Sequence, residues 1–183
     1  MTIDYTIEFF SYWHCGSGLA AGADVDALAI KDEDDLPYVP GRTVKGLLHD
    51  AAVTLSGLGA LKNENFIADV FGKSGDEEGH GQRSLASFGN ASITGPVRKS
   101  IIGGKLARGL YASVASTAID DDGIAKDHTL RKIQVVVPCA VRGKIFGVPD
   151  MYENDLRSCM AMVKRMGTGR SRGLGRCEIR EGD

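Results

Sequence analysis

The chain has 183 residues, of which 43% are apolar and 25% are charged, and its formal net charge is −2. These values fit one globular domain and exclude a disordered or membrane-spanning chain, because the charged fraction is ordinary and no apolar run is long enough to cross a bilayer. The first residues lack a basic start followed by an apolar core, so we expect no signal peptide, no membrane partner and a cytoplasmic protein.

The first part of the sequence predicts one strand followed by helices. Apolar and polar residues alternate over 3–9, which is the pattern of a half-buried strand. Glycine and alanine dominate 15–23, where we expect a loop, and the prolines and glycine of 37–41 mark a further break. Apolar residues then recur at helical spacing over 44–55, and a second, shorter helical piece is expected over 64–71.

The middle of the sequence predicts one strand between two irregular segments. Residues 72–83 are rich in glycine and charge, so we expect a flexible surface loop. A strand is expected over 85–93. Residues 95–131 contain glycine pairs, scattered basic residues and an Asp-Asp-Asp-Gly turn signal, and we expect them to form a hairpin-like excursion from the core.

The last part predicts a strand over 133–137, continued over 140–146 after a proline break, then a helix over 155–166 and a short strand over 176–180. With the excursion set aside, the order is β-α-β-β-α-β, so we expect one α+β domain over 1–183 with a ferredoxin-like arrangement. RNA recognition domains share this order. Their basic-aromatic strand signature is absent, so any RNA binding must use loops.

Cysteine and histidine give no sign of a zinc site or a disulfide framework. The four cysteines are widely spaced, and no pair has the C-x-x-C spacing. A disulfide is also not expected to persist in a cytosolic protein, where thiols are kept reduced. We therefore expect buried or half-buried thiols at Cys15, Cys139, Cys159 and Cys177.

The most distinctive stretch is the Gly-rich loop, residues 167–176, which reads Gly-Thr-Gly-Arg-Ser-Arg-Gly-Leu-Gly-Arg. Glycine permits positive φ, successive backbone N–H groups in such turns bind anions, and arginine forks match phosphate oxygens. The loop lies in the basic part of the chain, since 1–90 carry 6 Lys/Arg against 14 Asp/Glu and 91–183 carry 16 against 10. A phosphate-binding loop is expected, and a solvated turn is the alternative.

Other candidate positions precede the Gly-rich loop. Arg42 and Lys45 lie one turn apart where the first helix starts, and cations are unfavourable there unless an anion lies beside them, which favours a phosphate site. His14 follows the first strand without a partner at defined spacing. Asp24 and Asp26 could bind Mg²⁺ or serve as a general base, although their spacing fits an ordinary acidic loop equally well.

Four segments together resemble the RAMP superfamily of CRISPR-associated proteins, and in particular the repeated backbone subunit of type III effector complexes. They are the Trp-His-Cys-Gly-Ser-Gly of 13–18, the Leu-Pro-Tyr-Val-Pro-Gly-Arg-Thr-Val-Lys-Gly of 36–46, the segment 117–125 and the Gly-rich loop. These segments occur in the family's order and cover most of the chain. The 36–46 segment and the Gly-rich loop together are fairly specific to this family, whereas either one alone would be weak support for it.

The resemblance implies a modified RNA recognition fold in which the 95–131 excursion is a protruding thumb. It also implies the partners, namely CRISPR RNA, target RNA, the large and small subunits of the effector complex, and further copies of the chain. Such copies stack head to tail along the guide, because a heterologous interface that does not close gives an open filament.

The resemblance also assigns roles to residues. Asp26 would cleave target RNA with Mg²⁺ or another divalent cation, as both catalytic residue and metal ligand, and Asp24 and Asp32 are the fallbacks. Ile119 in the thumb would lie near a kink in the target. The implied RNA-binding residues are His14, Arg42, Lys45, Ile119, Gly169, Arg170, Ser171, Arg172 and Gly173.

Some features depart from the family pattern and leave other functions open. The chain is short for this type of subunit, and the acidic 120–122 segment would repel phosphate unless it faces solvent or a neighbour. The alternatives are a non-catalytic scaffold of the same family, a metal-independent guide-processing endoribonuclease, and an unrelated α+β protein that binds small anions. The 95–131 excursion and the segment that opens the first helix fit the processing enzyme poorly.

Overall fold

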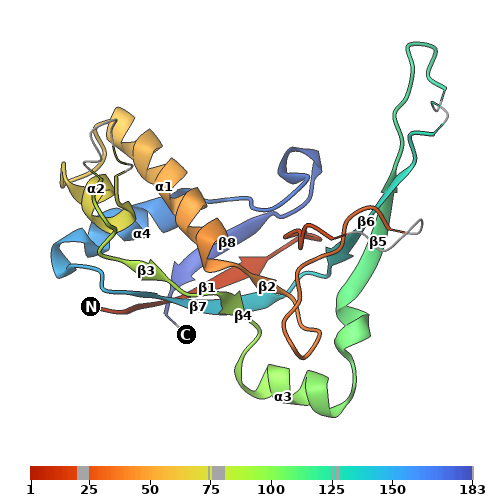
Figure 1. The fold of residues 1–183 in the computed structure, drawn as a ribbon, viewed down its shortest axis with the longest axis horizontal. Helices are drawn as coiled ribbons and strands as arrows, with labels where there is room; N and C mark the ends of the chain where they lie inside the picture. The colour runs from red at the N-terminus through yellow and green to blue at the C-terminus, as the bar shows by residue number, and fades with distance from the viewer. Residues whose placement is uncertain (20–24, 74, 76–80, 125, 127, 183) are drawn as a thin grey trace.

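The computed structural model describes the chain except residues 20–24, 74, 76–80, 125, 127 and 183 (Figure 1). The described elements form a six-stranded sheet, a separate two-stranded sheet and the helices around them. In chain order they are β1 (Ile3–Phe9), β2 (Tyr38–Val39), α1 (Gly41–Gly57), α2 (Phe66–Phe71), β3 (Ser87–Phe88), β4 (Ala91–Ser92), α3 (Gly95–Gly103), η1 (Ala107–Leu110), β5 (Tyr111–Ser116), β6 (Arg131–Val136), β7 (Ala140–Phe146), η2 (Asp150–Tyr152), α4 (Glu153–Met162), η3 (Arg170–Arg172) and β8 (Cys177–Glu181).

The larger sheet has the order β2-β4-β7-β1-β8, with β3 paired to β7, and its strand pairs are antiparallel. The expected strand over 85–93 is wrong as a single element, because it divides into β3 and β4. The break lies at Gly89 and Asn90. The Gly89 N–H donates to the carbonyl of Lys144, 2.9 Å away, and the Asn90 side chain accepts from the N–H of Gly41, also at 2.9 Å.

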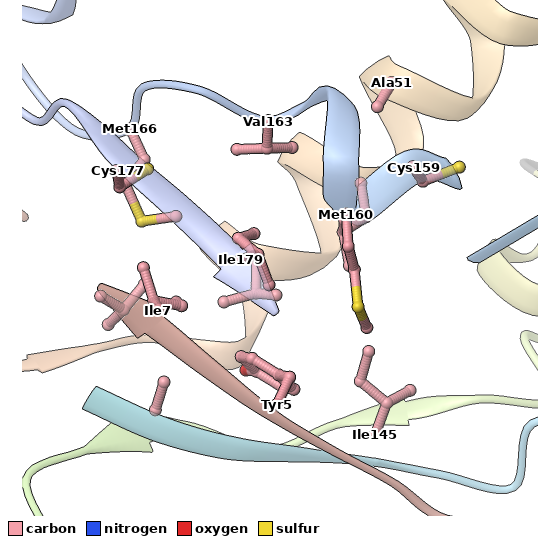
Figure 2. Packing of buried hydrophobic residues seen from close by; sticks show 14 of the residues in the cluster. Tyr5, Ile7, Ala51, Ile145, Cys159, Met160, Val163, Met166, Cys177 and Ile179 are labelled. Carbon is pink, nitrogen blue, oxygen red and sulfur yellow. The ribbon is translucent and has the colours of Figure 1, made fainter. Parts of the chain in front are cut away.

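Helices α1 and α4 cover one face of this sheet (Figure 1). The period-two pattern of β1 turns Tyr5 and Ile7 toward the helices, where they meet Met160 of α4 and Ile179 of β8 (Figure 2). Because all these side chains are buried, they form a single hydrophobic core. The alternation predicted for residues 3–9 is confirmed.

Helix α4 ends earlier than the sequence predicts. The expected helix over 155–166 stops at Met162, because Val163 has extended backbone and the carbonyl of Lys164 accepts the N–H of Cys177 at 2.9 Å. Val163 and Met166 remain buried beyond the helix end (Figure 2). The chain therefore leaves α4 and pairs beside β8 without losing core contacts.

The opposite face of the sheet carries exposed polar side chains in compensated pairs. Lys144 lies 2.5 Å from Asp4, and Arg180 lies 3.5 Å from Glu8 and 2.7 Å from Glu178. These charges are paired, and Arg142 of β7 is an exposed cation of this face with no ion pair among the described residues, so the face presents little uncompensated positive charge. A polyanion would gain little there.

The excursion contains a helix that the sequence did not reveal. Helix α3 has 9 residues and buries none of them fully, although Ile101 packs partly against the core, so its apolar pattern at Val97 and Ile101 is too short to predict a helix. β5 and β6 then form a two-stranded hairpin that extends away from the main sheet (Figure 1). β6 and β7 were expected to form a continued strand, which is wrong, since they lie in different sheets on either side of Pro138.

The cysteines are free and mostly buried. Burial raises the pKa of Cys15 and of Cys159 to about 12, so these thiols stay protonated and unreactive at neutral pH. None of the described helices is both long and apolar enough for a membrane span.

Candidate functional site

The Gly-rich loop is a hairpin whose ends are clipped together. The N–H of Met166 donates to the carbonyl of Gly175 at 2.9 Å. At the foot of the loop, the backbones of Arg165 and Arg176 form an isolated antiparallel β-bridge. At the tip, Gly169 (φ 74°) and Gly173 (φ 91°) flank the single turn Arg170–Arg172. These positive φ angles require glycine, as the sequence predicts.

His14 supports the loop from below. The His14 carbonyl accepts the N–H of Thr168 at 2.9 Å, and a Cβ at Gly167 would lie only 2.3 Å from the same oxygen. The His14 ring is buried, with 2% of the residue exposed, and Nδ1 lies 2.6 Å from the carbonyl oxygen of Gln134 in β6. Since a carbonyl can only accept, Nδ1 carries the proton. The described contacts of His14 are therefore positioning contacts, and a direct contact with RNA stays a prediction.

Asp26 lies against the edge of the β5–β6 hairpin. Its N–H donates to the Lys132 carbonyl at 2.8 Å and its Oδ2 accepts the Lys132 N–H at 2.7 Å, while Ala27 forms a parallel bridge with Ile133. The side chain is exposed, and Oδ1 has no hydrogen-bond partner among the described residues. One carboxylate oxygen is thus available to solvent or to a ligand.

A metal at Asp26 would depend on ligands from outside the chain. Within the described residues, no three His, Cys, Asp or Glu side chains cluster closely enough to hold an ion. Mg²⁺ is commonly bound by one or two carboxylates with water and substrate phosphates, so the single available oxygen of Asp26 fits that manner of binding and not a closed protein site.

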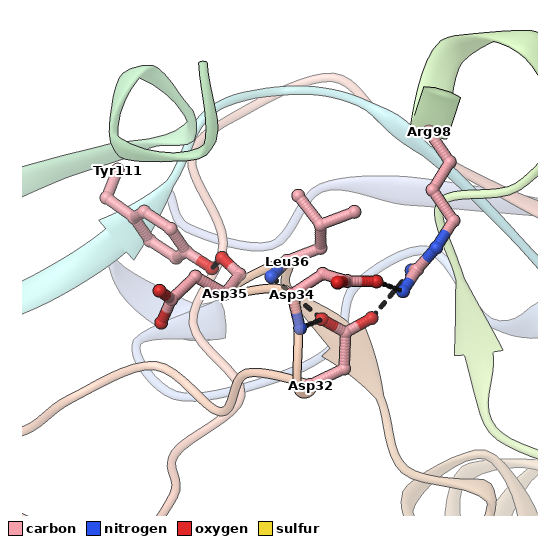
Figure 3. Close-up of polar contacts among 6 residues, drawn as sticks. All are labelled: Asp32, Asp34, Asp35, Leu36, Arg98 and Tyr111. Carbon is pink, nitrogen blue, oxygen red and sulfur yellow. Dashed lines mark hydrogen bonds and ion pairs between the residues drawn. The ribbon is translucent and has the colours of Figure 1, made fainter. Parts of the chain in front are cut away.

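Asp24 and Asp32 are the fallback candidates for the catalytic role of Asp26. Asp24 lies outside the described residues. Asp32 is engaged, since Arg98 binds it at 2.6 Å and also pairs with Asp34, and the N–H of Leu36 donates to it at 2.9 Å (Figure 3). Burial alone would raise the pKa of Asp32, but these hydrogen bonds outweigh burial and lower its pKa from the ordinary 3.8. Asp32 therefore stabilises its own turn and the contact with α3.

Arg42 and Lys45 form a separate cationic site at the start of α1. Gly41, which precedes them, packs so closely that a Cβ there would lie 2.0 Å from the Phe88 carbonyl oxygen. Arg42 is exposed, and the Lys45 ammonium donates to the Ser84 hydroxyl at 3.2 Å. Among the described residues, no hydrogen bond or ion pair joins these cations to the Gly-rich loop.

One of the three acidic residues at the end of the β5–β6 hairpin has a structural role in the turn there. The Asp120 carboxylate accepts the backbone N–H groups of Asp122 at 3.1 Å and Ile124 at 2.8 Å, so Asp120 stabilises its own turn. Ile119 is 66% exposed beside it. Tyr111, where β5 begins, donates its hydroxyl to the carbonyl of Asp35 at 2.7 Å and ties the hairpin to the main body (Figure 3).

Sequence reasoning missed an aromatic and basic group at the foot of the Gly-rich loop. Phe10, Lys164, Arg165 and Arg176 surround one hollow there. The strand alternation contained the signal for Phe10, because a strand that turns Phe9 inward turns the next residue outward. Arg176 already belonged to the predicted phosphate-binding loop, whereas Lys164 and Arg165 gave no sequence signal, because only the pairing of the loop ends brings them beside it.

Comparisons with known proteins give the family. The model of the RAMP superfamily matches residues 6–178. The chain belongs to the RAMP superfamily. Its mixed α/β fold with antiparallel sheets is consistent with a RAMP fold. A search of curated proteins returns no significant match.

Two solved structures resemble this RAMP protein in fold. One is a chain of the Type III-B Cmr-beta complex bound to cognate target RNA, with a TM-score of 0.74, 13% identity, and coverage of 99% of this chain and 97% of that chain. The other is a chain of the apo state of Type III-B Cmr-beta, with a TM-score of 0.69, 14% identity and the same coverage. At these identities the likeness concerns the fold.

Proposed function

We propose that this RAMP protein is a backbone subunit of a type III CRISPR interference complex, which binds CRISPR RNA and stacks head to tail along it. The observation that carries the proposal is the Gly-rich loop, fixed by His14 beneath it and carrying the exposed Arg170, Ser171 and Arg172 at its tip. The similarity to Type III-B Cmr-beta chains over nearly the whole length supports it.

We further infer that the main sheet is a modified RNA recognition fold of ferredoxin-like type. The strand order β4-β7-β1-β8, with α1 and α4 on one face, supports this inference, since the strand after the excursion lies between the first strand and the strand before the excursion. The charge pairs on the open face favour RNA contacts through loops.

The test of guide binding is whether the purified chain carries RNA. Nuclease-protected RNA should co-purify with it, and a regular ladder of protected lengths would reveal stacked copies. Replacing Arg170 and Arg172 with alanine should weaken binding to all RNA sequences alike and lower the salt dependence by about one unit per arginine, as expected for phosphate contacts. Lys144→Ala on the open face is the control. Protein that carries no RNA would exclude the proposal.

In the complete proposal, Asp26 cleaves target RNA. The 2′-oxygen attacks the adjacent phosphorus and the 5′-oxygen of the next nucleotide leaves, so the chain need only align the sugar and phosphate and assist proton transfer. The available Oδ1 of Asp26 could accept the proton or hold Mg²⁺ or another divalent cation. Such a cation, when bound, would offset the negative charge that develops on the phosphate.

Two substitutions separate the chemistry of Asp26 from its structural contact. Asp26→Ala removes the carboxylate, whereas Asp26→Asn keeps an oxygen that can accept the Lys132 N–H but loses the charge. Both should abolish cleavage by the assembled complex while target binding stays, as followed by gel analysis of labelled RNA with Mg²⁺ and with EDTA. Cleavage at the normal rate by either variant would refute the assignment.

A non-catalytic scaffold is the second candidate. It is favoured by the bond between Asp26 and Lys132, which already gives the carboxylate a structural role, and by the lack of a three-ligand cluster within the described residues. A scaffold predicts that wild-type complex with Mg²⁺ leaves bound target RNA intact.

A further inference from the structure

A hollow of about 370 Å³ opens at the foot of the Gly-rich loop, between the end of β1 and the start of β8. Its volume lies at the lower end of the range of ligand sites, about 300–1,000 Å³. The residues that line it are Phe10, Lys164, Arg165, Arg176, Cys177 and Glu178.

The aromatic wall of the hollow is Phe10, which the fold turns toward solvent. Phe9 stacks on Trp13 in the core, with ring centroids 4.3 Å apart, whereas Phe10 is 46% exposed. The backbone of Phe10 is nevertheless fixed, because its N–H donates to the Arg176 carbonyl at 2.8 Å. An exposed ring on a fixed backbone is a suitable surface for stacking a base.

The basic wall consists of three exposed cations. Throughout the part of the chain that the structure describes, no carboxylate lies within 4 Å of the charged groups of Lys164, Arg165 or Arg176. The acid at the hollow, Glu178, is paired with Arg180 at 2.7 Å, and this hydrogen bond, with a smaller contribution from the charge of Lys164, lowers the pKa of Glu178. The cluster therefore carries positive charge that a bound anion would compensate.

The hollow is continuous with the Gly-rich loop. The Arg165 guanidinium donates from Nη1 to the carbonyl of Arg170 at 2.8 Å, and the Arg176 guanidinium lies over one face of the Phe10 ring, with its carbon 5.8 Å from the ring centre, which leaves the other face for a base. A strand of RNA on the tip of the loop would therefore have an aromatic ring and further cations directly beside it.

We infer that this hollow binds one nucleotide of single-stranded RNA, with its base stacked on Phe10 and its phosphate held by Arg165 and Arg176. The inference rests on the proposed function and adds a contact to it. Stacking on phenylalanine accepts any base, so the site would not select sequence. It would hold a guide nucleotide in place next to the phosphates bound by the loop.

The test measures the affinity of the full-length chain for a labelled single-stranded RNA of mixed sequence by fluorescence anisotropy over a series of salt concentrations. Phe10→Ala should weaken binding by roughly 5- to 150-fold, with an unchanged salt slope, because stacking releases no counterions. Phe10→Tyr should keep the affinity. Arg165→Ala should lower the slope by about one unit. Phe146, which is 45% exposed on β7, provides the matched control in Phe146→Ala.

Circular dichroism verifies that each variant is folded, and Phe10→Leu, which keeps an apolar side chain without a ring, replaces Phe10→Ala if the latter unfolds. Wild-type affinity in the ring-deleted variant overturns the nucleotide site and leaves the guide-binding proposal standing. A wild-type chain that binds no RNA overturns both.

Discussion

The Gly-rich loop and the β5–β6 hairpin both extend beyond the core, but they are held in opposite ways. The loop rests on a buried residue, His14, and on glycines that contact backbone directly. The base of the hairpin is also fixed to the core, where Val135 and Val136 are buried, but its outer part, 115–132, is held by its own ladder and by its acidic turn, and most of the described side chains there are exposed. The position of the loop is thus fixed by the core, whereas the shape of the outer hairpin is set locally.

This difference predicts which substitutions should lower the stability of the protein and which should change only its binding. In the loop, a change that disturbs the backbone should unfold the region and remove any binding with it. In the outer hairpin, replacing an exposed side chain should leave stability almost untouched and alter only what that side chain contacts. Substitutions placed in each region test this contrast.

The largest effect is expected at Gly175. It has φ 68°, and a Cβ there would lie 1.8 Å from the Met166 carbonyl oxygen, so Gly175→Ala should lower the free energy of unfolding by about 3 kcal/mol or more. Among the described residues, and apart from chain neighbours, no atom lies within 4 Å of the point where a Cβ would lie at Gly173 in the same loop (φ 91°) or at Gly123 in the hairpin turn (φ 80°). Alanine at either should cost only about 1–2 kcal/mol. Urea unfolding measures all three, and equal losses would contradict the contrast.

A smaller effect is expected at His14. His14→Ala leaves the Gln134 carbonyl without its buried donor, which should cost about 1–3 kcal/mol. His14→Asn places an amide N–H near the position of Nδ1 and should recover part of the loss. Thermal unfolding compares the variants. If asparagine recovers nothing, the hydrogen bond to Gln134 is not what supports the loop.

At the base of the excursion, Arg98→Ala should cost about 1 kcal/mol or less at neutral pH, since its partners are partly exposed. The folded-state pKa of Asp32 is lowered, so its stabilisation is fully present above 3.8 and is lost as pH falls through the folded value. The difference in the free energy of unfolding between wild type and Arg98→Ala should therefore disappear once the pH is below the folded-state pKa of Asp32. Urea unfolding at several pH values measures it, with exposed Lys99→Ala as the control. A gap that is constant with pH would contradict the role of Asp32.

How far the sequence predicts this molecule depends on whether a feature is local. The strand over 3–9 and the first helix are predicted well, because their burial follows a period visible in the sequence. Helix α3 escapes prediction because its 9 residues carry too short an apolar pattern. The division of 85–93 into two strands escapes it because the break depends on Gly41 and Lys144, which are distant in sequence.

The candidate site follows the same rule. The positive φ angles of Gly169 and Gly173 are predicted from composition, because glycine itself is the signal. The burial of His14 under the loop and the Lys132 contact of Asp26 are not predicted, because both depend on β6, which lies more than a hundred residues later in the chain. Whether Asp26, Arg42 and Lys45 act on RNA stays a prediction.

The smallest effect on stability is expected at the end of the hairpin, at Ile119. Because Ile119 is 66% exposed, Ile119→Ala should change the free energy of unfolding by less than about 0.5 kcal/mol. If it wedges against a kinked target, as the family resemblance implies, 2-aminopurine at the kinked position should fluoresce strongly with wild-type complex and weakly with the variant, while guide binding stays unchanged. Ile124→Ala is the matched control, since Ile124 is 64% exposed in the same turn. Equal signals from both variants would mean that the hairpin contacts the target through its backbone or not at all.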